Sequence, residues 1–236
     1  AAGSDAPKVV KFFSGSNSLE RMLESQMIGK YVEEGIALNG TKKYSYLSLD
    51  VGSDVDICIS YVNEDGSFFC QLLSNASALD RVMCELQSCD KVPLLNPQVG
   101  APCSAICSAD NLRYRAVIRN LSGNVALVHF VDFGGEEEVG TNSLLEIPSS
   151  LLSLPSQALL CRLNNSADYV LPKVIGLLAK YESKIPLAAK VVGDFIELEL
   201  TDHSGFEPVQ LRSVLLAGTP RKRTTSSTQL EEALTR

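Results

Sequence analysis

The spacing of apolar residues changes along the chain, and each change predicts a different element. Between Ser18 and Gly35 apolar side chains recur at the period of a helix with one buried face. Ser18 is a helix-capping residue type and Gly35 ends the run, so we expect a helix over 18–35. This helix lies in an N-terminal extension that covers residues 1–50.

From Val55 to Tyr61 apolar and polar residues alternate, which predicts a strand with both of these residues on its buried face. The sequence Asn-Glu-Asp-Gly at 63–66 is typical of a hairpin turn and predicts a second strand over 67–72. Helical spacing returns over 77–89 and predicts a helix there.

Short strands with tight turns follow a proline-rich connection. Three prolines and a glycine over 92–102 are typical of a linker or strand entrance. The strands that we expect next occupy Cys103–Cys107, Arg113–Asn120, Val125–Asp132 and Glu136–Val139. Four or five short strands within about fifty residues predict a small barrel.

After the barrel, strands and helices mix again. The expected elements are a helical turn at 150–154, a strand at 157–163, a helix at 171–181, strands at 187–192 and 194–201, and a last segment near 209–216. Two strands alone are marginally stable, so the strands before the barrel need those after it as partners. We therefore predict a mainly β fold with some α, in which a barrel over 92–150 is inserted between two halves, 51–91 and 151–218, of one unit. The polar tail, 219–236, is predicted to be disordered.

Composition and charge exclude several classes of protein. No run of about 20 apolar residues is present, so we expect no membrane span, and residues 1–7 do not resemble a secretory signal. Seven cysteines without C-x-x-C spacing indicate reduced core residues of an intracellular protein, and with two histidines they predict no metal and no cofactor. The net charge of −7 favours basic partners over nucleic acid, although it also serves solubility. No catalytic motif is present, so we do not expect an enzyme.

Three aromatic residues of the predicted barrel are candidates for a binding site. Tyr114 and Phe130 lie on neighbouring strands and Phe133 lies at the turn that follows, so their rings can converge at the barrel mouth. A concave cluster of rings attracts a cation, and a planar guanidinium stacks well between rings. Ordinary core packing explains the same residues equally well.

Two motifs carry a resemblance to a known family. The string R-Y-R-A-x-I at 113–118, followed by V-x-F-V-D-F-G-G at 128–135, resembles the Tudor pattern Y-R-A-x-V … V-x-F-x-D-Y-G-N. The segment L-P-S-Q-A-L-L-C-R-L at 154–163 is similar to the one that follows the barrel in extended Tudor domains. Over about residues 50–218 the resemblance implies an SH3-like Tudor barrel inserted into a split staphylococcal-nuclease-like OB fold that acts as a scaffold.

The resemblance also implies a ligand, namely a methylarginine peptide, commonly from the arginine-rich N-terminal tail of a PIWI-type Argonaute. The family's aromatic cage maps onto Tyr114, Phe130 and Phe133. Two cage positions depart from the family, because Ser108 replaces an aromatic wall and Gly135 replaces an asparagine. Losing that asparagine acceptor costs about 1.5–3 kcal/mol, so we expect weak selection for dimethylarginine.

Acidic residues near the cage are candidate partners for an unmodified guanidinium, which keeps all five donors. They are Asp132, Glu136 and Glu137, and Asp132 has the alternative role of holding the turn. A further departure from the family is Arg113, which replaces the tryptophan that usually precedes Y-R-A.

The function that we predict is a non-catalytic module that binds an arginine-rich PIWI peptide as a scaffold of the piRNA pathway. Its expected location is a cytoplasmic, perinuclear germline granule. Two alternatives stay open. The cage is inactive and the surface mediates self-association or another protein contact, or the OB-like part binds RNA, which the acidic balance disfavours.

Overall fold

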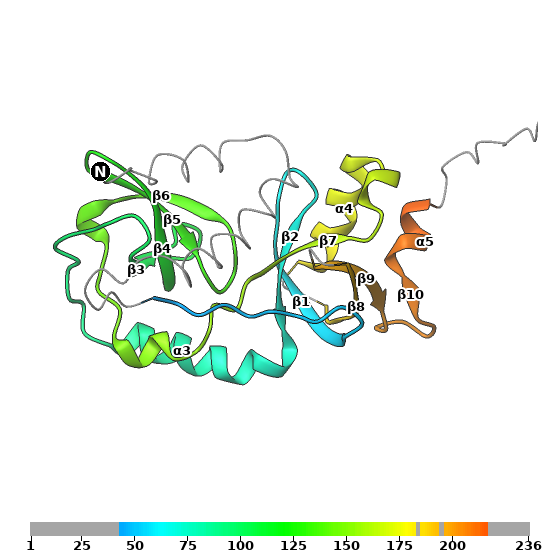
Figure 1. The fold of residues 1–236 in the computed structure, drawn as a ribbon, viewed down its shortest axis with the longest axis horizontal. Coiled ribbons are helices and arrows are strands. Elements are labelled where there is room, and N and C mark those ends of the chain that lie inside the picture. Colours follow the sequence, from blue (N-terminus) through cyan, green and yellow to red (C-terminus); the bar gives the residue numbers. More distant parts are fainter. Residues whose placement is uncertain (1–42, 183–184, 194–195, 217–236) are drawn as a thin grey trace, which may run out of the picture.

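The computed structural model describes residues 43–182, 185–193 and 196–216. Two β lobes lie side by side, and helix α3 (Ala76–Ser88) runs below the junction between them (Figure 1). Within the described ranges, no helix combines the length and the apolar character that a membrane span requires. The helix predicted at 18–35 and the tail at 219–236 lie outside the described residues.

One lobe is a closed barrel built from strands that are far apart in the sequence. The strands are β1 (Asp54–Val62), β2 (Phe68–Leu72), β7 (Leu159–Leu163), β8 (Leu187–Gly193), β9 (Glu197–Asp202) and the short β10 (Val209–Gln210). Their order is β10-β9-β7-β2-β1-β8, and the additional pairing of β8 with β9 closes the barrel. Because β2 pairs with β7 and β1 pairs with β8, the predicted interleaved fold is confirmed.

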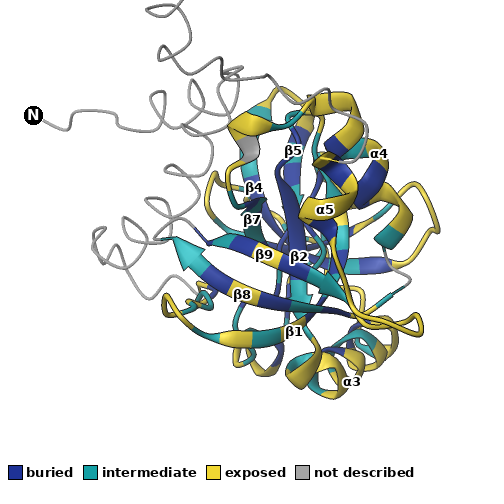
Figure 2. Cartoon of the chain, turned by 90° about the vertical axis from the view of Figure 1, so that its right-hand side faces the viewer, coloured by how far each residue is buried: buried dark blue, intermediate teal, exposed yellow. Residues whose placement is uncertain are grey.

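Two helices cover the outer end of this lobe. The amphipathic helix α4 (Leu171–Tyr181) buries its apolar face, including Leu178, and leaves the opposite face exposed (Figure 2). Its second residue is a proline, which the first turn of a helix tolerates. The segment expected near 209–216 divides into β10 and helix α5 (Leu211–Leu216), and the strand expected at 194–201 is observed as β9.

The strand pattern of β1 contains one error of prediction. The alternation places Tyr61 on the buried face with Val55, yet the Tyr61 side chain is 41% exposed. The register between β1 and β2 shifts between Ile59 and Tyr61, which marks a β-bulge. An extra residue in one strand turns the following side chains to the other face, so Tyr61 leaves the core and points towards the second lobe.

The second lobe is a four-stranded antiparallel sheet with the order β3-β4-β5-β6. The strands are β3 (Pro102–Ile106), β4 (Arg113–Ser122), β5 (Val125–Phe130) and β6 (Glu136–Gly140). Strand β5 ends two residues earlier than predicted, because the chain turns after Phe130. Short 3-10 turns connect the elements at Leu73–Asn75, Thr141–Ser143, Ser149–Leu152 and Ser166–Asp168.

A separate apolar cluster holds α3 against the outer face of the second lobe, with Leu86 and Val117 at its centre. Arg113 contributes a polar contact to the same junction. Its buried guanidinium donates to the carbonyls of Gln87 at 2.7 Å and Cys89 at 3.1 Å, where α3 ends. A cation suits a helix C-terminus, so the residue that replaces the family's tryptophan caps the helix and fastens it to the sheet.

Candidate functional site

A buried ion pair fixes the base of the candidate site. Arg115 donates to both carboxylate oxygens of Asp132, at 2.8 and 2.6 Å, and to three backbone carbonyls in the segment 151–155. All five guanidinium N–H groups therefore have an acceptor. Asp132 also accepts from the Gln157 N–H, so this carboxylate joins the second lobe to the segment that returns to the first.

The three predicted cage rings lie together. The centroid of the Tyr114 ring is 5.7 Å from that of Phe130 and 5.0 Å from that of Phe133, and both pairs are close to edge-to-face. These separations are typical of interacting aromatic pairs. Phe130 belongs to the core of the second lobe, whereas Tyr114 and Phe133 are half-buried. Phe130 thus forms the floor of the cluster and the other two rings form its sides.

Two carboxylates border these rings. The Tyr114 hydroxyl donates to Asp110 at 2.6 Å, and the backbone N–H of Ser108 donates to the Glu137 carboxylate at 3.1 and 3.2 Å. Burial raises the pKa of Tyr114, and the bond to Asp110 raises it further. The same bond, with help from the Leu112 N–H, lowers the pKa of Asp110. A carboxylate therefore stands at the position where the family has an aromatic wall.

The other acidic candidates lie elsewhere. Asp132 is 1% exposed and fully engaged by Arg115, which fits its alternative role of holding the turn and leaves no access for a ligand. Glu136 pairs with His129 across the sheet and faces the first lobe, away from the rings. The sequence marks Asp110 only as part of a turn, although its position four residues before Tyr114 is a usable signal.

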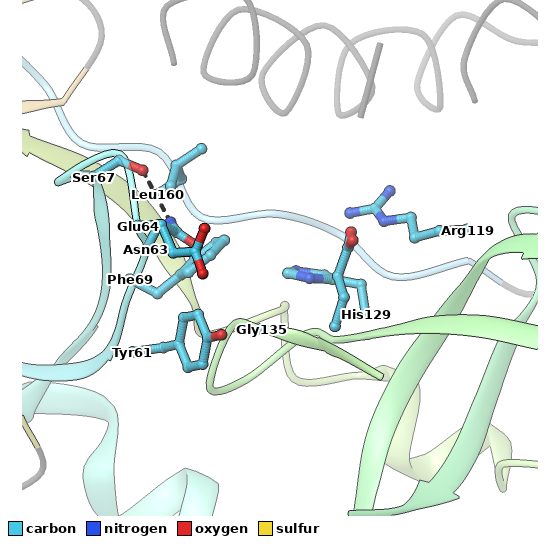
Figure 3. A pocket seen from close by; sticks show the side chains of 10 residues that line it. Tyr61, Asn63, Glu64, Ser67, Phe69, Arg119, His129, Gly135 and Leu160 are labelled. Carbon is cyan, nitrogen blue, oxygen red and sulfur yellow. Dashed lines mark hydrogen bonds between the residues drawn. The ribbon is translucent and has the colours of Figure 1, made fainter. Parts of the chain in front are cut away.

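A cavity of about 250 Å³ lies between the two lobes (Figure 3). Tyr61, Glu64 and Phe69 line it from the first lobe, and His129 and Gly135 line it from the second. Figure 3 shows the two groups of side chains facing one another. The cavity therefore meets the second lobe at the turn that follows the cage residue at position 133.

His129 makes the fold sensitive to acid. Burial, with repulsion from Arg119, lowers the pKa of His129 to about 3, whereas an unfolded histidine titrates near about 6.5. The unfolded chain binds this proton first as the pH falls, so stability is lost below about pH 6.5, by up to about 1.4 kcal/mol per pH unit. We expect urea unfolding at about pH 7 and pH 5 to show a smaller pH effect in His129→Gln than in the unchanged chain. Equal pH effects in the two proteins would contradict this.

Comparison with known families agrees with this geometry. The family model described as "Tudor domain" matches residues 49–165. These residues belong to the Tudor domain family, and the strands on either side of the inserted sheet complete the fold of an extended Tudor domain. Domains of this class are binding modules. In the described part of the chain, no group of three or more His, Cys, Asp or Glu side chains is arranged to hold a metal ion.

Several relatives and solved structures are similar to this chain. Human Tudor domain-containing protein 1 is 29% identical over 188 residues, which are 74% of this chain and 16% of that protein. Human Tudor domain-containing protein 6 is 30% identical over 165 residues, which are 66% of this chain and 8% of that protein. The chain thus matches a small part of these relatives.

Two solved extended Tudor domains have similar folds and contain modified peptides. The domain of human TDRD1 in complex with a symmetrically dimethylated peptide is 29% identical, with a TM-score of 0.66 and coverage of 77% of this chain and 96% of that one. Domain TD3 of mouse TDRD1, in complex with a MILI peptide containing dimethylarginine, is 26% identical, with a TM-score of 0.65 and coverage of 74% and 95%.

Proposed function

We propose that this domain is a non-catalytic module that holds an arginine side chain of a peptide among Tyr114, Phe130 and Phe133. The observation that carries the proposal is the convergence of these three rings, two of them half-buried, beside the Glu137 carboxylate. Ring faces and a carboxylate together suit a planar cation. The peptides in the two similar TDRD1 structures support an arginine ligand.

The ligand that fits best is an arginine-rich segment, such as the N-terminal tail of a PIWI-type Argonaute. The chain carries a net charge of −7, which attracts basic partners. One of the two TDRD1 peptides comes from MILI and the other from a differently named protein, so the shared chemistry, arginine, is a firmer guide than the source. A scaffold role in a cytoplasmic, perinuclear germline granule is part of the same proposal.

The cage favours unmodified arginine or tolerates both forms. Ser108 and Gly135 supply neither the ring nor the side-chain acceptor that the family uses, and Glu137 stands beside Ser108 instead. A carboxylate pairs with guanidinium N–H groups, and each methyl group removes one such donor. Methylation therefore adds apolar contact but weakens the ionic contact, and the two effects oppose each other.

The cage makes a direct prediction about binding. Phe133→Ala removes one side of the ring cluster and is expected to weaken binding of an arginine-rich peptide by about tenfold, since one cation–π contact is worth about 0.5–2 kcal/mol. Calorimetry with one peptide, unmodified and symmetrically dimethylated, measures both the loss and the methylation preference. Phe206→Ala is the matched control, because Phe206 is fully exposed in the first lobe, between β9 and β10.

The outcomes separate the alternatives. Unchanged binding in the Phe130→Ala, Phe133→Ala double variant would exclude the cage and favour a scaffold that acts through another surface. Clearly tighter binding of the dimethylated peptide would sink the preference for unmodified arginine but leave the peptide site in place.

A further inference from the structure

The cavity between the lobes adjoins the cage across a two-residue turn. Gly134 and Gly135 both have positive φ angles, of 84° and 78°. A Cβ atom on Gly135 would lie 3.1 to 3.4 Å from three atoms of the Tyr61 ring. Position 135 therefore points towards Tyr61 and into the cavity, while Phe133, two residues earlier, belongs to the cage.

Aromatic rings form a row along the cavity wall. The Phe69 ring centroid is 6.5 Å from that of Tyr61 and 5.4 Å from that of His129. Phe69 is buried, whereas Tyr61 is 41% exposed because the bulge in β1 turns it out of the core. An accessible tyrosine ring on a rigid strand is a surface on which a planar cation stacks.

The charges that line the cavity leave one negative charge in excess. Two carboxylates, Glu64 and Glu136, and one guanidinium, Arg119, contribute. Arg119 and Glu136 attract one another, as the effect of Glu136 on the pKa of Arg119 indicates. Glu64 is exposed and, within the described residues, forms no ion pair. Its turn is held by the Asn63 side chain, which donates to the Ser67 hydroxyl at 2.9 Å.

We infer that this cavity is a second subsite, in which a second arginine of the same peptide stacks on Tyr61 and pairs with Glu64. The inference rests on the proposed function, since the first arginine occupies the cage. Phe133 and Gly135 are two residues apart, and an extended chain advances about 3.3–3.6 Å per residue. A peptide whose arginines are about two or three residues apart therefore reaches both subsites.

Calorimetry with designed peptides tests the second subsite. One peptide has a single arginine in a Gly-Ala background with glutamine at the variable position, and the others place a second arginine there, two or three residues away on either side. We expect the best two-arginine peptide to bind about fivefold more tightly than the single-arginine peptide, from one exposed ion pair and one cation–π contact.

Variants locate the second contact. In Glu64→Gln and in Tyr61→Ala the advantage of the second arginine is expected to fall below about twofold. Glu138→Gln removes the same charge as Glu64→Gln but lies on the exposed side of β6, outside the cavity, and is expected to keep the full advantage. Glu64 lies in an exposed turn, so its substitution tests the subsite even if Tyr61→Ala disturbs the fold.

The outcomes distinguish this inference from the function on which it rests. A second-arginine advantage that persists in both Glu64→Gln and Tyr61→Ala would overturn the inference. So would the absence of any advantage, if the single arginine still binds in a way that depends on Phe133. Binding of neither peptide would refute the proposed function and the second subsite with it.

Discussion

Substituting Arg115 by methionine is expected to lower the free energy of unfolding by about 3–5 kcal/mol, which is a large part of the stability of an ordinary domain. Arg115 is fully buried, and its loss leaves the Asp132 carboxylate buried without its cation. Three backbone carbonyls in the segment 151–155 lose their donors at the same time. Lysine has three donors on a single atom and cannot replace the guanidinium at five positions, so Arg115→Lys is expected to be nearly as harmful.

Urea unfolding followed by circular dichroism measures this loss. The matched control is Asp54→Asn, which breaks the exposed pair between Asp54 and Lys190. That pair is worth less than about 1 kcal/mol, because water and salt screen it. Similar midpoints for Arg115→Met and Asp54→Asn would show that the buried pair does not hold the lobes together.

Gly134→Ala is expected to cost about 3 kcal/mol. A side chain at φ 84° is strained by about 1–2 kcal/mol in any surroundings. At this position a Cβ atom would also overlap the Phe69 ring and lie 2.7 Å from the Phe69 Cβ. Phe69 is buried between the lobes and cannot move aside without disturbing its neighbours, so the overlap adds a packing cost of about 1–3 kcal/mol.

Gly123→Ala separates the two contributions. Gly123 also has a positive φ, of 58°, but a Cβ atom there would meet nothing within 4 Å. The control therefore carries the backbone strain without the overlap, and it is expected to cost only about 1 kcal/mol. Equal losses in the two variants, measured by urea unfolding, would mean that the contact with Phe69 contributes nothing.

Much of the fold follows from local patterns. The alternation in β1 and β2, the helical spacing of α3 and α4 and the closely spaced turns of the second lobe predicted these elements within a few residues. The argument that two strands need partners also predicted the pairing of β2 with β7. Short-range periodicity carries this information because it reflects which face of each element is buried.

Part of the candidate site followed from sequence as well. The three aromatic positions are predictable because their motif places two on neighbouring strands and one at the turn between strands, and the rings do lie together. The roles of the acidic residues did not follow. Asp132, Glu136 and Glu137 lie within six positions of one another in the sequence, yet one is buried under Arg115, one faces the first lobe and one borders the cage. Neighbouring positions of a twisted strand and turn point in different directions, so proximity in sequence does not place a carboxylate.

The sequence by itself determined the class of fold, the family and the three rings of the cage, because each rests on a local pattern or motif. Only the tertiary structure decided what surrounds them. The bulge in β1 moves Tyr61 out of the core, and the insertion of one lobe into the other brings it against Gly135, across 74 positions of the chain. A register shift of one residue leaves no mark on hydrophobic spacing, since tyrosine suits either face of a strand. The second subsite therefore depends on strand pairing and lobe packing, which local spacing does not encode.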